Sequence, residues 1–167
     1  MKDIDRTRKE WIGALRGRLI ARRHALGLSV AAAADAAGLT EKQLALVEAD
    51  SVNIYLDQAI PLLWPYEADL RWLCGLRMPG GLQPVPTLEA IDYTARRNMR
   101  NLRIGRGAGI PTANREAWKD RWAESTLVRW ESGEYTRLDL FRLQLIADWH
   151  EIPLYDLLTD GLESFPT

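Results

Sequence analysis

The chain has 167 residues and a formal net charge of −1, with 47% hydrophobic and 27% charged residues. This length allows one medium domain or two small ones, and the composition is that of an ordinary globular protein, not of a disordered one. The longest apolar runs, 30–34 and 59–64, are too short for a membrane span and the N-terminus has no apolar signal segment, so we expect a cytoplasmic protein without a membrane partner.

The charges alternate along the chain. Residues 1–25 contain 8 basic and 3 acidic residues, and residues 26–90 contain 3 and 8. Residues 91–130 contain 9 basic and 4 acidic residues, and residues 131–167 contain 2 and 8. This pattern predicts two similar units, each basic at its beginning and acidic at its end, so that basic surfaces can exist in a nearly neutral chain.

The first half predicts short helices that pack through one apolar side. Trp11, Leu15 and Leu19 recur at helical spacing, and the alanine-rich run 30–37 has a high helix propensity. Ser29 is a suitable N-cap for a helix that begins at residue 30.

A further helix is predicted at 41–49, after a break at Gly38. Thr40 supplies its N-cap, and Leu44 and Val47 form its apolar side. The positions predicted to be exposed on it are Lys42, Gln43 and Leu46. Two helices joined by so short a turn have the geometry of a helix-turn-helix, whose second helix enters the major groove of DNA.

A break between two domains is predicted in the middle of the chain. Residues 75–90 contain three glycines and three prolines, which predicts a linker at 76–88 between domains at 1–75 and 89–167. No segment alternates polar and apolar residues for long enough to predict a strand. We therefore expect an all-α fold with about five short helices on each side of the linker.

A fixed offset of 83 residues relates the two halves and keeps apolar residues paired with apolar residues over about 45 positions. The pairs include Leu19 with Leu102, Arg23 with Arg106, Ser29 with Thr112, Leu44 with Leu127 and Glu48 with Glu131. The sequence therefore predicts an internal repeat.

Two stretches resemble the phage-repressor and Cro-like, or Xre-type, helix-turn-helix family. They are LIARRHALGLSVAAAADAAGLTEKQLALVEA at 19–49 and STLVRWESGEYTRLDLFRLQLIADWHEIPLYDLL at 125–158, within a resemblance that covers 12–74 and 96–158. It implies two tandem lambda-repressor-like helix-turn-helix domains. It also implies that the protein is a transcriptional regulator that binds double-stranded DNA with sequence specificity. Such regulators are in general repressors and are found in phages and mobile elements.

The resemblance and the chemistry of base readout together predict the contact residues. Arginine can donate two hydrogen bonds to guanine, glutamate can accept from cytosine, and serine and threonine can contact bases or phosphates. The predicted DNA-binding residues are Thr40, Lys42, Gln43, Arg106, Arg121, Glu124, Ser125, Thr126, Arg129 and Arg137. The arginines within 16–23 and 96–106 are expected to supply phosphate contacts.

Departures from the family pattern leave a second function open. Val30 and Ala113 stand where the family often has glutamine, and Leu46 and Asp50 make the first domain the poorer reader. The alternative is an interaction protein of the antitoxin or anti-repressor type, in which one helix-turn-helix domain contacts proteins. The partner is then a protein antagonist or a second copy of the chain, and the fold alone does not decide between the two functions.

Catalytic and metal chemistry are not predicted. His24 and His150 lack cysteine, serine or carboxylate partners at motif spacing, Cys74 is the only cysteine, and no strand precedes the glycines at 105–109. We expect no enzyme activity, no catalytic residues, no cofactor and no metal. Trp118, Trp122 and Trp130 are expected in the core.

The predicted linker of about 14 residues could reach the ~34 Å between adjacent major grooves. Because the two recognition helices differ, we expect one chain to occupy one asymmetric or bipartite DNA site.

Overall fold

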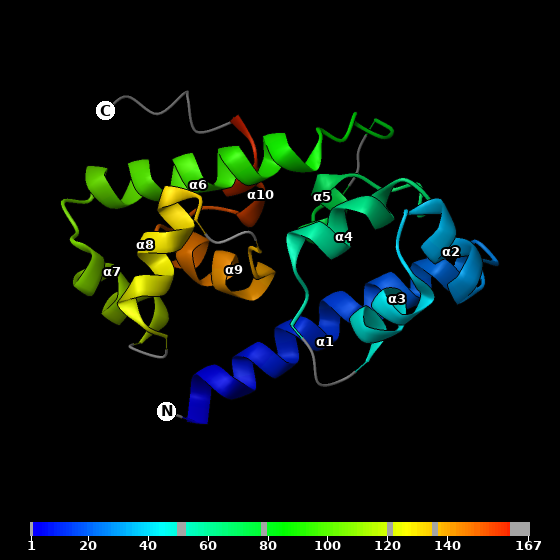
Figure 1. Ribbon diagram of the computed structural model, residues 1–167, viewed down its shortest axis with the longest axis horizontal. Helices are drawn as coiled ribbons and strands as arrows, with labels where there is room; N and C mark the ends of the chain where they lie inside the picture. Colours follow the sequence, from blue (N-terminus) through cyan, green and yellow to red (C-terminus); the bar gives the residue numbers. More distant parts are fainter. Residues whose placement is uncertain (1, 50–52, 78–79, 120–121, 135–136, 161–167) are drawn as a thin grey trace. The chain divides into compact units, whose positions relative to one another are not determined.

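The computed structural model describes residues 2–49, 53–77, 80–119, 122–134 and 137–160. Across these residues the chain forms ten α-helices and no strand (Figure 1). It divides into two compact units, Met1–Val85 (unit 1) and Pro86–Thr167 (unit 2). The predicted all-α architecture, with about five helices on each side of a break, is confirmed.

In each unit one long helix precedes four shorter ones. The helices of unit 1 are α1 (Lys2–Ala25), α2 (Val30–Ala36), α3 (Glu41–Glu48), α4 (Leu56–Leu63) and α5 (Leu70–Leu73). Those of unit 2 are α6 (Leu88–Gly105), α7 (Ile110–Trp118), α8 (Glu124–Ser132), α9 (Leu140–Trp149) and α10 (Leu154–Leu158).

Unit 1 packs around apolar side chains of α1, α3 and α4, and the helix starts predicted for α2 and α3 are confirmed. Its fully buried residues include Leu15, Leu19, Leu44, Val47, Leu62 and Leu63. The Ser29 hydroxyl accepts a hydrogen bond from the Ala32 N–H at 3.0 Å, and the Thr40 hydroxyl accepts one from the Gln43 N–H at 3.2 Å. Gly38 has a φ of +66°, which lies in the left-handed region. Glycine adopts this conformation without strain and is common directly after a helix.

In both units an arginine of the first helix is bound to a glutamate of the third. Arg23 in α1 donates to the two carboxylate oxygens of Glu48 at 2.7 and 2.8 Å and to the carbonyl oxygen five residues further along at 2.9 Å. Arg103 in α6 makes the same three contacts, to Glu131 at 2.7 and 2.6 Å and to the carbonyl oxygen five residues further along at 2.8 Å. We call these two pairs the arginine–glutamate bridges. Each fixes the end of α3 or α8 on the long helix of its unit.

A second arginine of each long helix supports the same place. Arg16 donates from Nε to the Val47 carbonyl oxygen at 3.0 Å, and Arg96 donates from Nη1 to the Trp130 carbonyl oxygen at 2.6 Å. In both units the acceptor is the residue just before the bridge glutamate. The two units therefore share their interior contacts as well as their helix order.

These contacts correct the register of the internal repeat. Arg103 lies 80 positions after Arg23, whereas Glu131 lies 83 positions after Glu48. The prediction that Arg106 is the counterpart of Arg23 is wrong, because unit 2 has three additional residues between its bridge partners. Two of them lengthen a helix, since α7 has nine residues and α2 has seven. A single offset cannot describe both sides of this insertion.

The connection between the units is shorter than the predicted linker at 76–88. The Asp69 carboxylate accepts a hydrogen bond from the Gln83 N–H at 3.0 Å, and Arg71 donates to the Gly81 carbonyl oxygen at 2.6 Å. These contacts attach residues 81–83 to the beginning of α5. Because Thr87 caps α6, the free connection is reduced to residues 84–86.

Loss of one bridge carboxylate should loosen its own unit only. Glu131→Ala leaves the Arg103 side chain, 15% exposed, without its counter-charge, and removing one partner of a buried ion pair costs about 3–5 kcal/mol. Native-state hydrogen exchange should show this loss in the amides of α6 and α8, and no change in those of α1 and α3. Glu134→Ala, which removes an exposed carboxylate nearby, is the control and should cost less than about 0.5 kcal/mol. Equal protection in the two variants would show that the bridge does not stabilise unit 2.

Candidate functional site

The exposed side of α8 is the candidate functional surface. The helix buries Leu127 and Trp130 against the core of unit 2. Its exposed residues are Glu124, Ser125, Val128, Arg129 and Ser132, whereas Thr126, predicted to be exposed, is half-buried. The surface therefore combines one cation, one carboxylate, two hydroxyl groups and one apolar side chain.

Three tryptophans and one arginine pack beside α8. The ring of Trp118, at the end of α7, meets the rings of Trp122 and Trp130 edge-on, with centroids 5.6 and 5.5 Å apart. The Arg142 guanidinium of α9 lies 4.5 Å from the centre of the Trp122 ring and 5.8 Å from that of Trp130. The Trp118 indole N–H donates to the Arg142 carbonyl oxygen at 3.3 Å. This group, the tryptophan cluster, holds the chain just before α8 through Trp122 and the last turn of α8 through Trp130, next to the bridge at Glu131.

The predicted core positions of the tryptophans are confirmed for Trp118 and Trp130, which are fully buried. Trp122 is half-buried and covers the edge of the core. Its ring lies against the Arg142 guanidinium, and a cation shielded from water is attracted to a ring face.

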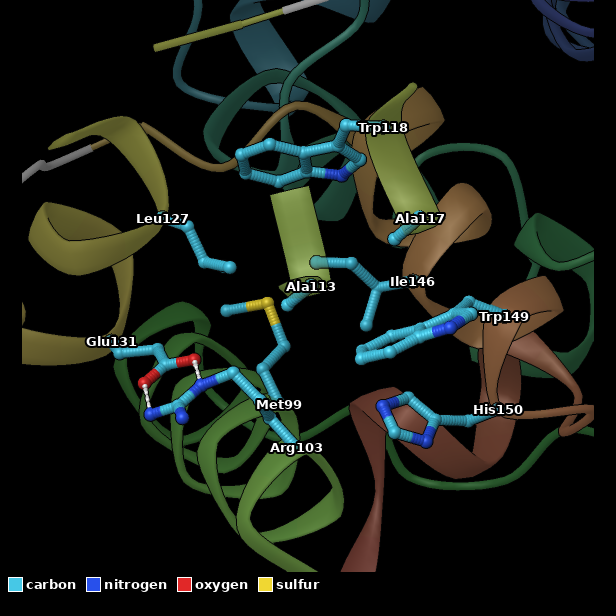
Figure 2. Close-up of a pocket in the computed structure, with 10 residues that line it drawn as sticks. All are labelled: Met99, Arg103, Ala113, Ala117, Trp118, Leu127, Glu131, Ile146, Trp149 and His150. Carbon is cyan, nitrogen blue, oxygen red and sulfur yellow. Dashed lines mark hydrogen bonds and ion pairs between the residues drawn. The ribbon is translucent and has the colours of Figure 1, made fainter. Parts of the chain in front are cut away.

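The interior behind α8 leaves no room for a small-molecule ligand. Figure 2 shows the cavity there, which lies among Met99, Ala113, Leu127, Ile146 and other residues of unit 2 and has a volume of about 10 Å³. This is close to the space of a single water molecule. His150 also lines the cavity, and burial and the neighbouring Arg106 lower the pKa of His150 to about 4. The ring is therefore neutral near pH 7 and packs as an uncharged group.

Two cations at the end of α7 precede this surface along the chain and were not predicted as site residues. Arg115 and Lys119 are exposed, and neither forms an ion pair within the part of the chain that the structure describes. Arg115 lies in the last turn of α7, and Lys119 follows the helix as its C-cap residue, in the left-handed conformation with a φ of +54°. Two cations close together at a helix end are the signal from which the sequence could have revealed them.

Arg129 and Arg137 are exposed as predicted, and Arg121 lies outside the described residues. The Arg129 side chain is 55% exposed, and its Nε lies 4.0 Å from a carboxylate oxygen of Glu134, which is itself 67% exposed. Ion pairs between such exposed side chains are weak. An external anion or base can therefore compete with Glu134 for Arg129.

Most arginines in the basic stretches of α1 and α6 are not available for the phosphate contacts that the sequence predicts. Arg16, Arg23 and Arg96 are buried, with exposed fractions of 5%, 8% and 8%, so they cannot reach a phosphate. Four others donate to acceptors of their own unit: Arg18 to Leu73 at 2.9 Å, Arg22 to Tyr66 at 2.7 Å, Arg97 to Asp160 at 2.7 Å and Arg103 to Glu131. These guanidinium groups bind the unit's own carbonyl and carboxylate oxygens.

Arg106 is exposed, but it is bound to α9. Its Nη1 donates to the Trp149 carbonyl oxygen at 2.7 Å, and its guanidinium lies 5.0 Å from the centre of the Trp149 ring. The Trp149 indole N–H in turn donates to a Glu116 carboxylate oxygen at 2.9 Å. Arg106 thus joins the end of α6 to α9 and is not part of the exposed side of α8.

The corresponding surface of unit 1 carries less positive charge. The Gln43 amide oxygen accepts a hydrogen bond from the Thr40 N–H at 2.7 Å, so both side chains form a capping box at the start of α3. Lys42 is the single cation of α2 and α3, and it is exposed. Leu46 occupies the place of Arg129 and is 42% exposed.

Neither metal ligation nor similarity assigns a function to the chain. Among the described residues, no group of three or more His, Cys, Asp or Glu side chains is placed to hold a metal ion. None of the helices in the described ranges combines the length and the apolar character needed to cross a membrane. No protein-family model, curated protein or solved structure matches the chain.

Replacement of the stacked arginine should loosen the beginning of α8. Arg142→Lys keeps the charge but loses the planar group, and a shielded cation–aromatic contact contributes up to about 2 kcal/mol. Amide exchange in α7 and α8 should become at least about tenfold faster, while the amides of α10 keep their protection. Arg115→Lys, at an exposed position of α7, is the matched control. Unchanged exchange in Arg142→Lys would mean that the tryptophan cluster holds α8 without the cation.

Proposed function

We propose that the chain is a transcriptional regulator that binds double-stranded DNA with sequence specificity through two tandem lambda-repressor-like helix-turn-helix domains. In this proposal α7 and α8 of unit 2 form the principal reading element, and the expected action is repression by occupation of the site. The observation that carries the proposal is the exposed side of α8, a helix held in its last turn and at the residue pair that precedes it, which bears Glu124, Ser125 and Arg129.

The chemistry of these side chains suits base readout in the major groove. Arg129 can donate two hydrogen bonds to guanine, Glu124 can accept one from the amino group of cytosine, and Val128 can contact the methyl group of thymine. Such contacts need a helix held at a constant angle, since a displacement of its axis moves every side chain at once. The tryptophan cluster and the bridge to Glu131 meet this requirement.

The cations of α7 suit the second requirement of DNA binding, which is the neutralisation of phosphates. Arg115 and Lys119 have no internal counter-charge in the described part of the chain, so binding DNA breaks no ion pair of theirs. Phosphate contacts set affinity and orientation, whereas contacts of α8 set the sequence. Unit 2 offers both kinds of residue.

The exposed residues of α2 and α3 in unit 1 favour a second candidate function. Nucleic-acid binding depends on excess positive charge, but Lys42 is accompanied there by the exposed carboxylates of Asp35 and Glu41. Leu46 adds an exposed apolar group. These features support a protein-binding role for unit 1, as in an interaction protein of the antitoxin or anti-repressor type, whose partner is a protein antagonist or a second copy of the chain.

The short connection between the units changes the expected spacing of their contacts on DNA. Residues 84–86 span at most about 11 Å when extended, so a flexible tether of about 14 residues does not set the distance between two reading helices. We propose that one chain binds one asymmetric, bipartite DNA site. The motif found in a DNA selection tests this proposal.

Selection of duplexes from a random pool by the full chain should enrich a defined motif. Arg129→Ala should then weaken binding to that motif by about 1–3 kcal/mol and relax the preference at one base pair, because one base contact is lost. Arg77→Ala, at an exposed arginine outside α7 and α8, is the control and should bind as the wild type does. Absence of any enriched motif would refute the proposed function. A motif with two different half-sites would support the bipartite site, and a palindrome would contradict it.

The salt dependence of DNA binding should identify the phosphate contacts. Arg115→Gln and Lys119→Gln should each reduce the slope of log K against log salt by about 0.9, because each removes one phosphate contact. Arg106→Gln should leave the slope unchanged, since Arg106 is bound to Trp149. A reduced slope in Arg106→Gln alone would restore the contact that the sequence predicts and exclude the α7 pair.

A further inference from the structure

An open groove follows the outer side of α6 and ends against the last residues of α8. It is bounded by Tyr93, Arg97, Arg100 and Ile104 of α6, by Ser132 of α8 and by Gly133, which follows α8, and its volume is about 450 Å³. A groove of this size accommodates several side chains of a bound ligand. Its α6 residues are separate from those proposed to read DNA.

The groove gives α6 a second apolar side. Tyr93, Arg97, Arg100 and Ile104 follow one another at intervals of four, three and four residues, which places them on one face of the helix. The opposite face is covered by the core of unit 2 and includes the buried Ile91, Ala95 and Met99. On the groove face Tyr93 is 66% exposed and Ile104 is 56% exposed. Among the described residues of unit 2, apolar groups therefore stand exposed at both ends of this face.

The charges between these two apolar groups are positive. Arg97 donates to a carboxylate oxygen of Asp160 at 2.7 Å, which shows that a carboxylate fits beside this face. Arg100 is exposed and forms no ion pair with any residue in the described ranges. The carboxylate of Glu131 is already bound to Arg103, so it does not neutralise Arg100. The groove thus keeps one uncompensated cation between two apolar groups.

Unit 1 shows that the fold does not require these side chains. In the register of the bridge arginines, the four positions correspond to Gly13, Gly17, Ile20 and His24 of α1. A Cβ atom at Gly13 or Gly17 would meet no atom within 4 Å, so this side of α1 is open. The same helix arrangement therefore forms with glycine in place of Tyr93 and Arg97, and a role of the groove residues in folding does not account for them.

We propose that the α6 groove binds an acidic segment of a partner protein. A carboxylate of the segment pairs with Arg100, and an apolar side chain of the segment packs on Tyr93 or Ile104. Tyrosine and arginine are enriched at the centres of protein interfaces, where aromatic area and directed hydrogen bonds combine. The inference goes beyond the proposed function, because it assigns unit 2 a protein contact in addition to DNA.

Two other occupants fit the groove less well. A second α6 of another copy would bring its own Arg97 and Arg100 against those of the first, and like charges at close approach are unfavourable. DNA phosphates would pair with Arg100 but would leave Tyr93 and Ile104 without apolar contact. A phosphate-binding surface also needs more than one uncompensated cation. An acidic segment with an apolar residue satisfies both kinds of group.

Selection from a displayed library of random dodecapeptides on the full chain tests the proposal. We expect enrichment of sequences that combine Asp or Glu with a large apolar residue. Binding of a selected peptide should fall by at least about tenfold in Arg100→Glu and in Tyr93→Ala, as expected for residues at the centre of an interface. Arg77→Glu, a charge reversal at an exposed arginine outside the groove, should bind the peptide as the wild type does.

The outcomes separate this inference from DNA binding. No enrichment, or peptides that bind Arg100→Glu as well as the wild type, overturns the groove assignment and leaves the proposed role of α8 unaffected. The affinity of the same variant for random duplex DNA tests whether DNA, and not a protein segment, occupies the groove. Equal DNA affinity of Arg100→Glu and wild type supports the proposal, whereas a lower affinity with a reduced salt slope places Arg100 at phosphates and overturns it.

Discussion

The rest of each unit depends on a buried ion pair between its first and third helices. Arg23 with Glu48 and Arg103 with Glu131 are shielded from water, and such a pair is stable only when its remaining donors are also bound. Both arginines meet this condition by donating to the loop carbonyl five residues further along. Hydrogen bonding to the glutamate raises the pKa of each arginine, so the pair stays charged. One side chain thus joins the first helix, the loop after it and the third helix.

The same contacts explain why the net charge of a chain segment does not predict how much charge its surface offers to a partner. The long helices are rich in arginine, but most of these guanidinium groups bind carbonyl or carboxylate oxygens of their own unit. In unit 2 the positive charge without a carboxylate partner among the described residues comes from other positions, mainly Arg115 and Lys119 at the end of α7 and Arg100 on the outer side of α6. Unit 1 has the same interior and lacks this outer set. The two halves are therefore alike in the contacts that form the fold and different in those available for binding.

Features that depend on local chemistry could be predicted from the sequence. The caps at Ser29 and Thr40 and the buried side of α3 follow from residue type and helical spacing, and the structure has them as expected. The roles of the arginines could not be predicted, because whether a guanidinium reaches a phosphate or a carbonyl depends on which chain segment packs beside it. The fixed repeat offset of 83 is wrong before the insertion for a related reason: it fits the residues after the three additional residues of unit 2, and the sequence alone does not show where those residues lie. The linker was overestimated because Asp69 binds a backbone N–H fourteen residues away, a contact that glycine and proline content does not indicate.

The buried side of α8 also fixes the rotation of the helix about its own axis. Such a rotation would carry Leu127 and Trp130, 4% and 0% exposed, out of the apolar interior. The azimuth at which the helix presents its outward residues is thus set by one aliphatic and one aromatic side chain. A change in the bulk of either would turn the outward residues toward a new direction.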